Sequence, residues 1–335
     1  MALRIAINGF GRIGRLAFRA ILERNESDIE VICINDLGPT ESNAHLLKYD
    51  SVHGILPFEV GVKEDHLLVG DRKITVTSER EPKNLPWKDM DIDIVFECTG
   101  FFASKKAASE HLTAGAKKVL ISAPAKEADI TVVFGVNSDQ LSSSDQIISN
   151  ASCTTNCLAP VAKVMHDNFG IERGFMTTIH SFTGDQRTVD TLHTDLHRSR
   201  ASSVSMIPTS TGAAKAVGLV LPELQGKLDG TSIRVPTPNV SVIDFKFVPK
   251  ADVKVSDINQ AVIDASDGKL NGILGYNEAP LVSVDFNHNP LSSVFDIPET
   301  QVIENKFVRI LSWYDNEWGF SNRMIDTAKA IGKLM

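Results

Sequence analysis

The sequence predicts an α/β protein of two domains: a doubly wound, mostly parallel sheet, then an α+β domain with a mostly antiparallel sheet. The chain has 335 residues, which suits two hydrophobic cores better than one. Strand-like and helix-like runs alternate through residues 3–137, which is typical of parallel βαβ units. Strand-like runs then dominate three later segments, residues 231–249, 280–286 and 306–315.

The composition is that of a globular protein, with 42% apolar and 23% charged residues. No apolar run approaches the roughly 18–20 residues that span a bilayer, and the start "MALRIAINGFGRIGR" lacks the features of a signal peptide. The net charge of −8, without a concentrated basic stripe, gives little support to a nucleic-acid partner. Four cysteines in so long a chain suit a reducing compartment. We therefore expect a cytoplasmic protein without a membrane or dedicated nucleic-acid partner.

The first elements are a strand over residues 3–8, a glycine-rich turn and a helix. The turn "GFGRIG" places Gly9, Gly11 and Gly14 in G-x-G-x-x-G spacing. Gly9 permits the tight turn, Gly11 lets the backbone approach a pyrophosphate, and Gly14 lets the helix pack on the strand. The start of the helix offers unpaired N–H groups and a positive dipole end to phosphates.

The second strand ends in an acid. The run "IEVICIND" finishes at Asp36, 22 residues after Gly14. An acid at this place accepts hydrogen bonds from the adenosine ribose hydroxyls and repels a 2′-phosphate. Strand, glycine triplet, helix, strand and acid in this order predict a Rossmann-type dinucleotide-binding domain that prefers NAD to NADP. The alternative for Asp36 alone is a loop acid that caps a neighbouring turn.

The alternation continues in four segments: strand-like residues 91–100, helix-like residues 103–115, and strand-like residues 117–124 and 130–137. Gly115 is suited to end the helix. Ligands of doubly wound sheets bind at the carboxyl ends of the strands. Thr99 and Ser122 lie at two such ends, so they are candidates to line a nicotinamide ribose pocket. Strand-end polar residues without a ligand are the alternative.

A strand-like run over residues 147–150 leads into "ASCTTNCLAPVAKVMHDNFG", whose apolar residues recur at helical spacing. Ser152 is a candidate N-cap, which puts Cys153 in the first turn. There the positive end of the helix favours a lowered thiol pKa and a nucleophilic thiolate. Cys157, one turn further, is expected to pack in the core. The C-x-x-x-C spacing has no matching second pair, so we expect no metal site.

A nucleophilic cysteine requires a base. His180 follows a strand-like run within residues 174–186 and precedes a polar loop. The other histidines lie mostly in loops or on polar helix faces. Spacing alone leaves open whether His180 is a base or an ordinary buried residue.

Five segments together resemble the phosphorylating glyceraldehyde-3-phosphate dehydrogenase family: "INGFGRIGR", "SNASCTTNCLAP", "TSTGAAKAVG", "RVPTPNVSV" and "WYDNEWGFSNRM". The resemblance covers residues 2–333, and the run "ASCTTNC" is highly specific. The segments "TGDQ" and "DLHRSRA" look like the bacterial and chloroplast branch.

The resemblance implies an NAD-dependent enzyme. Cys153 would attack the aldehyde of glyceraldehyde 3-phosphate, and His180 would act as base and then as acid. Hydride transfer to NAD would leave a thioester on Cys153. Inorganic phosphate would then release 1,3-bisphosphoglycerate.

The resemblance also implies the binding residues. The substrate's C3 phosphate would be held by Thr183, Arg198 and Arg234. The attacking phosphate would be held by Ser152, Thr154, Thr211 and Gly212. Contacts to NAD would come from Arg12, Ile13, Asp36, Arg80, Ser122 and Asn316. Among these, Asn316 would bond the nicotinamide amide and fix which face of the ring meets the substrate.

Asn316 lies far from the glycine-rich turn in sequence, so the chain must return to the cofactor domain. We therefore expect an NAD-binding domain over residues 1–151, completed by a C-terminal helix over 317–335, and a catalytic domain over 152–316. Residues 181–209 are unusually long for a loop, which is typical of a functional segment. In the family that the chain resembles, this segment lies at a subunit interface, which implies a homotetramer.

Two features leave alternatives open. NAD-preferring bacterial members often carry Leu-Pro where this chain has Thr191 and Leu192, which leaves Asp36 as the main barrier to NADP. The segment "VDFNH" at 284–288 resembles erythrose-4-phosphate dehydrogenase, which shares the scaffold. The stretch "TSTGAAKAV" argues against that enzyme, because its helix start and glycine suit a second phosphate. A third alternative is a protein that keeps this fold and binds RNA or other partners without catalysing a reaction. The sequence features that favour it are the Lys-Lys pairs at 105–106 and 117–118.

Overall fold

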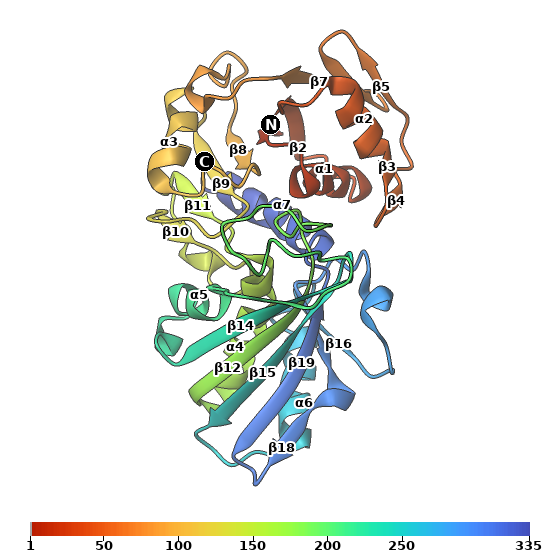
Figure 1. The fold of residues 1–335 in the computed structure, drawn as a ribbon. Coiled ribbons are helices and arrows are strands. Elements are labelled where there is room, and N and C mark those ends of the chain that lie inside the picture. Colours follow the sequence, from red (N-terminus) through yellow and green to blue (C-terminus); the bar gives the residue numbers. More distant parts are fainter. Residues whose placement is uncertain (1) are drawn as a thin grey trace. The chain divides into compact units, whose positions relative to one another are not determined.

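The computed structural model describes residues 2–335, which form two compact units. Unit 1 contains the chain up to Val132, Gln140–Ala151 and Ser321–Met335. Unit 2 contains Val133–Asp139 and Ser152–Phe320. Figure 1 shows unit 1 mainly in red to yellow, with the blue end of the chain, and unit 2 mainly in green to blue.

Unit 1 is built on a nine-stranded sheet in the order β10-β11-β9-β8-β1-β2-β7-β6-β5. Neighbouring strands from β10 to β7 are parallel, whereas β6 and β5 extend the sheet in antiparallel fashion. The strands are β1 (Leu3–Asn8), β2 (Ile29–Asn35), β5 (Val60–Lys63), β6 (His66–Val69), β7 (Arg72–Thr77), β8 (Ile94–Glu97), β9 (Lys118–Ile121), β10 (Ile130–Thr131) and β11 (Ile147–Ser149). A separate hairpin joins β3 (Tyr49–Asp50) and β4 (Gly54–Ile55). The predicted doubly wound architecture is confirmed.

The long helices of unit 1 are α1 (Arg12–Glu23), α2 (Thr40–Lys48) and α3 (Lys105–Thr113), and most of α7 (Trp318–Gly332) belongs to this unit. Helix α3 ends as predicted, because Gly115 adopts a φ of +106° after the C-cap Ala114. The predicted strand over 130–137 is wrong beyond Thr131. There the side chain of Asn137 accepts the N–H of Val133 at 2.9 Å, so that N–H cannot join the ladder.

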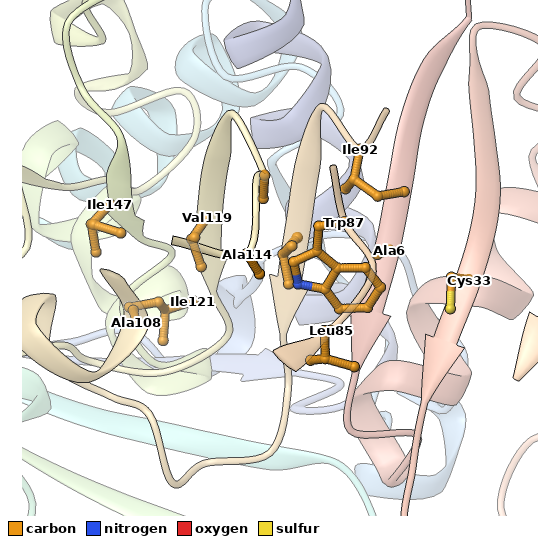
Figure 2. Packing of buried hydrophobic residues seen from close by; sticks show 12 residues of the cluster. Ala6, Cys33, Leu85, Trp87, Ile92, Ala108, Ala114, Val119, Ile121 and Ile147 are labelled. Atoms are coloured by element: carbon orange, nitrogen blue, oxygen red, sulfur yellow. The ribbon is translucent and has the colours of Figure 1, made fainter. Parts of the chain in front are cut away.

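An apolar cluster in unit 1 surrounds Trp87 (Figure 2). The indole ring lies near Leu85, Ile92 and Ala6, and all of Trp87 is shielded from solvent. Its Nε1–H donates to Nδ1 of His111 at 3.0 Å, so the one polar atom of this side chain is satisfied. The cluster therefore fixes a polar contact inside an otherwise apolar core.

Unit 2 is built on an eight-stranded, mostly antiparallel sheet in the order β13-β14-β12-β15-β19-β17-β16, with β18 also paired to β19. The pairs β12–β14 and β16–β17 are parallel. The strands are β12 (Ile171–Ser181), β13 (Ile207–Thr209), β14 (Leu228–Val235), β15 (Ser241–Pro249), β16 (Leu274–Asn277), β17 (Ser293–Asp296), β18 (Gln301–Ile303) and β19 (Phe307–Tyr314). The mostly antiparallel second sheet is confirmed.

The helices of unit 2 are α4 (Cys153–Phe169), α5 (Ala213–Val220) and α6 (Val255–Asp267). Helix α4 packs against β12, β15, β17 and β19, so it covers one face of the sheet. Short 3-10 turns lie at Pro82–Asn84, Ser138–Gln140, Pro222–Leu224, Ser283–Phe286 and Ile297–Glu299. No helix within residues 2–335 combines the length and apolar character needed to cross a membrane.

One predicted strand of unit 2, residues 280–286, is wrong. Its second half forms the 3-10 turn Ser283–Phe286. The carboxylate of Asp285 accepts the N–H of Val282 at 2.8 Å, which closes the turn. Phe286 is buried at the end of the turn, so the apolar residues of this segment reflect packing in the core and do not indicate a strand.

Candidate active site

Unit 1 contains a cavity of about 510 Å³ at the carboxyl ends of β1, β2 and β8. Its lining includes five of the predicted cofactor residues: Gly9, Gly11, Asp36, Arg80 and Thr99. These residues come from four separate parts of the sequence, and the parallel sheet brings them to one edge. This is the edge at which doubly wound sheets bind their ligands.

The three glycines of the turn have different environments. Gly9 has a φ of +89°, and a Cβ there would lie 2.8 Å from the backbone nitrogen of Thr99. A Cβ on Gly14 would lie 2.1 Å from the carbonyl oxygen of Gly9. At Gly11, by contrast, nothing lies within 4 Å of a Cβ position, and this N-cap of α1 has no side-chain cap. Open backbone at a helix N-terminus fits a pyrophosphate.

Asp36 is half-buried beside the same cavity. Its Oδ2 accepts the N–H of Phe10 at 2.8 Å, and its Oδ1 accepts the N–H of Gly38 at 2.9 Å. Each carboxylate oxygen can accept a further hydrogen bond. The turn-capping alternative and the ribose contact are therefore compatible, because the two backbone bonds orient the carboxylate.

The other candidates for cofactor contacts have different surroundings. The guanidinium of Arg12 forms an ion pair with Asp50; although burial opposes the shift, the Arg12 hydrogen bond lowers the pKa of Asp50 to about 2. Ile13 is half-buried in the first turn of α1, and Arg80 is exposed. Ser122, just beyond β9, is half-buried and hydrogen bonds to the Cys98 thiol. Arg80 therefore has the greatest freedom to turn toward a ligand.

Sequence reasoning missed a buried polar network next to the cavity. Glu97 accepts from Nδ2 of Asn8 at 2.6 Å and from Nε2 of His111 at 2.9 Å. Because Trp87 donates to Nδ1 of His111, the Nε2 nitrogen carries the proton. The other oxygen of Glu97 accepts the N–H of Thr99 at 2.8 Å, so the network fixes the backbone that touches Gly9. Its members are far apart in sequence, and no spacing pattern links them.

Unit 2 brings Cys153 and His180 into contact. Ser152 is the N-cap of α4, as predicted, and its Oγ accepts the N–H of Thr155 at 3.0 Å. Cys153 is consequently the first residue of the helix. His180 is the penultimate residue of β12, and its Nε2 lies 3.5 Å from Sγ of Cys153.

Nε2 of His180 faces the thiol, and Nδ1 faces Ser181 and Arg234. Nδ1 lies 2.7 Å from the carbonyl oxygen of Ser181, which can only accept, and 2.7 Å from Nη1 of Arg234, which can only donate, so the two contacts favour opposite tautomers. In the tautomer with its proton on Nδ1, the lone pair of Nε2 points at Sγ, as a base requires. Burial and the nearby charge of Arg234 lower the pKa of His180 to about 3, so the resting imidazole is neutral.

The thiol of Cys153 responds to opposing influences. Burial raises its pKa, and this exceeds the lowering by the Arg234 guanidinium and by the N–H groups at the start of α4. The prediction of a lowered thiol pKa from the helix position alone is wrong for this chain. Since the resting thiol keeps its proton, nucleophilic attack requires transfer of that proton to the His180 imidazole.

Two helix N-termini lie next to each other in unit 2. The hydroxyl of Thr155 donates to the carbonyl of Ala213 at 3.3 Å, which ties the start of α4 to the start of α5. Gly212 is the N-cap of α5 and has no side-chain cap, and Thr211 accepts the N–H of Ala213 at 3.2 Å. Two adjacent helix starts are suited to bind an anion through their backbone N–H groups.

Thr154 belongs to the same place, but its hydroxyl is already engaged. It lies 2.8 Å from the hydroxyl of Tyr314, and the side chain is buried. Thr154 can therefore offer its backbone N–H to an anion more readily than its hydroxyl.

Arg234 supplies positive charge near the thiol, and Arg198 lies close enough to Arg234 to influence it. Burial lowers the pKa of Arg234, and the charge of Arg198 contributes to this lowering. The Nη1 of Arg234 donates to the Ser181 carbonyl at 3.1 Å, and its Nε has no hydrogen-bond partner among residues 2–335. Arg198 forms an ion pair with Asp185, and Thr183 donates to Gln186 at 3.2 Å. A bound phosphate would complete the unfilled donors of this group.

Asn316 is buried in unit 2, where its Oδ1 accepts from the hydroxyls of Ser181 and Ser241.

All four cysteines are free thiols. Within residues 2–335, no group of three His, Cys, Asp or Glu side chains is arranged to hold a metal ion.

Comparison with known proteins gives matches along the whole chain. Two family models match: "Glyceraldehyde 3-phosphate dehydrogenase, NAD binding domain" over residues 3–105, and "Glyceraldehyde 3-phosphate dehydrogenase, C-terminal domain" over residues 152–316. The chain is 63% identical over 334 residues to glyceraldehyde-3-phosphate dehydrogenase of Xanthobacter flavus, with 100% of both chains covered. It is 60% identical over 335 residues to that of Cereibacter sphaeroides, again with 100% of both covered. It is 55% identical over 332 residues to that of Geobacillus stearothermophilus, covering 99% of this chain and 98% of the relative.

Proposed function

The chain belongs to the glyceraldehyde-3-phosphate dehydrogenase family, and from this premise we propose that it oxidises glyceraldehyde 3-phosphate with NAD and inorganic phosphate to 1,3-bisphosphoglycerate. The observation that carries the proposal is the 3.5 Å contact between Sγ of Cys153 and Nε2 of His180 at the start of α4. A nucleophile in contact with a neutral base is the arrangement that covalent aldehyde chemistry requires.

Cys153 attacks the aldehyde carbon of the substrate, forming a carbon–sulfur bond while its thiol proton passes to Nε2 of His180. The negative charge that develops on the aldehyde oxygen is stabilised by the N–H of Cys153 and by the protonated imidazole. In this proposal the reactive tautomer donates Nδ1–H to the Ser181 carbonyl, which keeps the orientation of the imidazole.

The protonated imidazole returns its proton to the aldehyde oxygen, which gives a hydroxyl group on the carbon attached to sulfur and a neutral His180. Bound NAD would supply the hydride acceptor for oxidation of that carbon to a thioester on Cys153, and His180 would take the hydroxyl proton. An oxygen of inorganic phosphate then attacks the thioester carbon, and the carbon–sulfur bond breaks. Cys153 leaves as a thiolate, and the acyl phosphate is the product.

The two phosphates are assigned to different donors in this proposal. Thr183, Arg198 and Arg234 bind the C3 phosphate of the substrate. The joined helix starts, with Ser152, Thr154, Thr211 and Gly212, bind the attacking phosphate. The start of α5, where the N-cap Gly212 has no side chain to cap the helix, and the unfilled Nε of Arg234 support this division.

We assign NAD to unit 1, with the pyrophosphate on the glycine-rich turn and the adenosine ribose on Asp36. In this proposal the NAD-binding domain is residues 1–151 with 317–335, and the catalytic domain is residues 152–316. Contacts from Arg12, Ile13, Arg80, Thr99 and Ser122 belong to the same proposal. Asn316 donates to the nicotinamide amide.

Asp36→Gly is expected to raise the ratio of kcat/KM for NADP to that for NAD roughly tenfold, since one charge repulsion of ~1.4 kcal/mol is removed. Initial rates with each cofactor at saturating aldehyde measure the ratio. Asp71→Gly, an exposed acid outside the cavity, is the control. An unchanged ratio in Asp36→Gly would count against the ribose contact.

The proposed function is tested by following NADH formation from glyceraldehyde 3-phosphate with and without inorganic phosphate. We expect steady turnover only when phosphate is present. Erythrose 4-phosphate is the second arm of the same assay. If it is much the better substrate, the chain is instead an erythrose-4-phosphate dehydrogenase.

We further propose that the chain forms a cytoplasmic homotetramer. Residues 181–209 expose several large apolar side chains that water alone would not favour: Val189, Leu192, Leu196, Val204 and Met206. The four free thiols are compatible with a reducing compartment. Sedimentation equilibrium should give four times the 36.5 kDa of one chain. A single-chain mass at micromolar concentration would contradict the assembly.

A further inference from the structure

The carboxamide of Asn316 lies in a pocket of hydroxyl groups inside unit 2. Its Oδ1 is 2.8 Å from Oγ of Ser181 and 2.8 Å from Oγ of Ser241. Ser181 is the last residue of β12, and Ser241 is the first residue of β15. The three side chains are buried, at 0%, 1% and 5% exposure for Ser181, Ser241 and Asn316.

The protons in this cluster can be assigned. The N–H of Ser181 donates to Oγ of Ser241 at 3.0 Å, so the single hydroxyl proton of Ser241 goes to Oδ1 of Asn316. The hydroxyl of Ser181 donates to the same oxygen. A carbonyl oxygen has two lone pairs, and both are used. The remaining group of Asn316 is its NH₂, which can only donate.

The backbone around the cluster is held firmly. Val240, next to Ser241, is a buried β-branched residue with a φ of +67°, which is a strained conformation for such a side chain. Its other neighbour, Asn239, donates to the carboxylate of Asp315 at 2.8 Å. Strain of this kind persists only where the surroundings determine the conformation.

Ser181 also takes part in the nucleophile's environment. Its carbonyl oxygen lies 2.7 Å from Nδ1 of His180, while its hydroxyl donates to Oδ1 of Asn316. One residue thus orients the base through its backbone and the carboxamide through its side chain. A change to alanine removes only the second role.

We propose that Ser181 and Ser241 are positioning residues that make Asn316 a pure hydrogen-bond donor, which selects the carbonyl oxygen of the nicotinamide carboxamide and so fixes the reacting face of the ring. The inference rests on the proposed function. It assigns a task to two hydroxyls that do not themselves touch the reacting atoms.

The test uses the full-length variants Ser181→Ala, Ser241→Ala and the double variant. Glyceraldehyde 3-phosphate carrying deuterium at the aldehyde carbon is oxidised, and proton NMR reports on which face of the product NADH the deuterium lies. We expect one face in the unaltered chain and a mixture in the double variant. The KM for NAD should rise roughly tenfold, the effect of one poorly oriented hydrogen bond.

Three controls separate positioning from general damage. Ser293→Ala removes a buried hydroxyl that lies 2.6 Å from Ser312 in the same sheet, and should change neither readout. Ser241→Thr keeps the hydroxyl, so its product NADH should carry deuterium on one face, as in the unaltered chain. Alkylation of Cys153 by iodoacetate without NAD should be unchanged in all variants, because the Ser181 carbonyl is retained.

A double variant with one reacting face and an unchanged KM for NAD would overturn the inference. If that variant does not fold, the donor role of Asn316 is tested by measuring how tightly the unaltered chain binds two analogues of NAD. One carries 3-acetylpyridine, which keeps the carbonyl oxygen, and one carries unsubstituted pyridine, which lacks it. Binding of the acetyl analogue at least tenfold more tightly supports the donor assignment, and equal binding refutes it. Failure of the unaltered chain to bind NAD at all would refute the proposed function instead.

Discussion

Cys153→Ser is expected to reduce the oxidation of glyceraldehyde 3-phosphate on the order of 10⁴-fold or more, the range seen when an enzyme loses its nucleophile. A serine hydroxyl has a much higher pKa than a thiol, and the neutral imidazole of His180 is too weak a base to ionise it. The hydroxyl would also give an ester, which phosphate cleaves less readily than a thioester. Initial rates of NADH formation measure the loss.

Binding of NAD should survive this change, because Cys153 belongs to unit 2 and the cofactor cavity is lined by unit 1. Calorimetric titration should give a Kd within about threefold of the unaltered chain, a difference under 1 kcal/mol. Cys157→Ser is the matched control. Its thiol is buried 3.3 Å from Oγ of Ser293, and burial raises its pKa to about 12, so it has no part in the reaction. Activity within tenfold of normal in Cys153→Ser would remove the basis of the mechanism.

The parts of the fold that were predictable are those with local causes. Gly9 and Gly14 could be recognised because each must accommodate a backbone atom where a Cβ would sit. Ser152 could be recognised as an N-cap because capping depends on three neighbouring residues. Apolar runs were sufficient to predict the class of both sheets and several of their strands. In each case the sequence neighbourhood contains the physical reason.

Other features depend on partners that are distant in sequence. The segment at 280–286 has the apolar pattern of a strand, but Asp285 caps the segment into a turn. Glu97 and His111 form a buried pair that no sequence motif predicts. Ser181 and Ser241 meet at Asn316 only because β12 and β15 are adjacent. Registers of nonconsecutive strands determine these contacts, and composition does not encode them.

The pKa of Cys153 shows the same division. Its place in the first turn of α4 was predictable, and that place does lower the thiol pKa. Burial has the opposite and larger effect, and it comes from residues distant in sequence, among them His180, whose Nε2 lies 3.5 Å from Sγ. Position in the helix therefore identified the nucleophile, whereas its protonation state required the three-dimensional structure.

His180→Asn is expected to lower the rate of NADH formation by about 10²–10⁴-fold, the usual contribution of a general base. Asparagine keeps a hydrogen-bonding group but cannot take the thiol proton. Since burial keeps Cys153 protonated, alkylation by iodoacetate near neutral pH should also slow. The measurement is the loss of titratable thiol at several pH values. His166→Asn is the control, because His166 lies in the last turn of α4 and accepts the N–H of Ile171 at 3.0 Å.

The pH dependence gives an independent check on the same residue. The pKa of His180 is about 3 in the folded chain and 6.5 when unperturbed, because burial and Arg234 oppose its charge. Between these values the unfolded chain binds a proton that the folded chain does not, so stability falls as pH falls from 6.5 toward 3. His180→Asn should flatten that part of the stability curve measured by urea unfolding. Alkylation of the unaltered chain should show no decline centred on pH 6.5. If such a decline appears and His180→Asn leaves it in place, another group titrates there and the imidazole is not the base that activates Cys153.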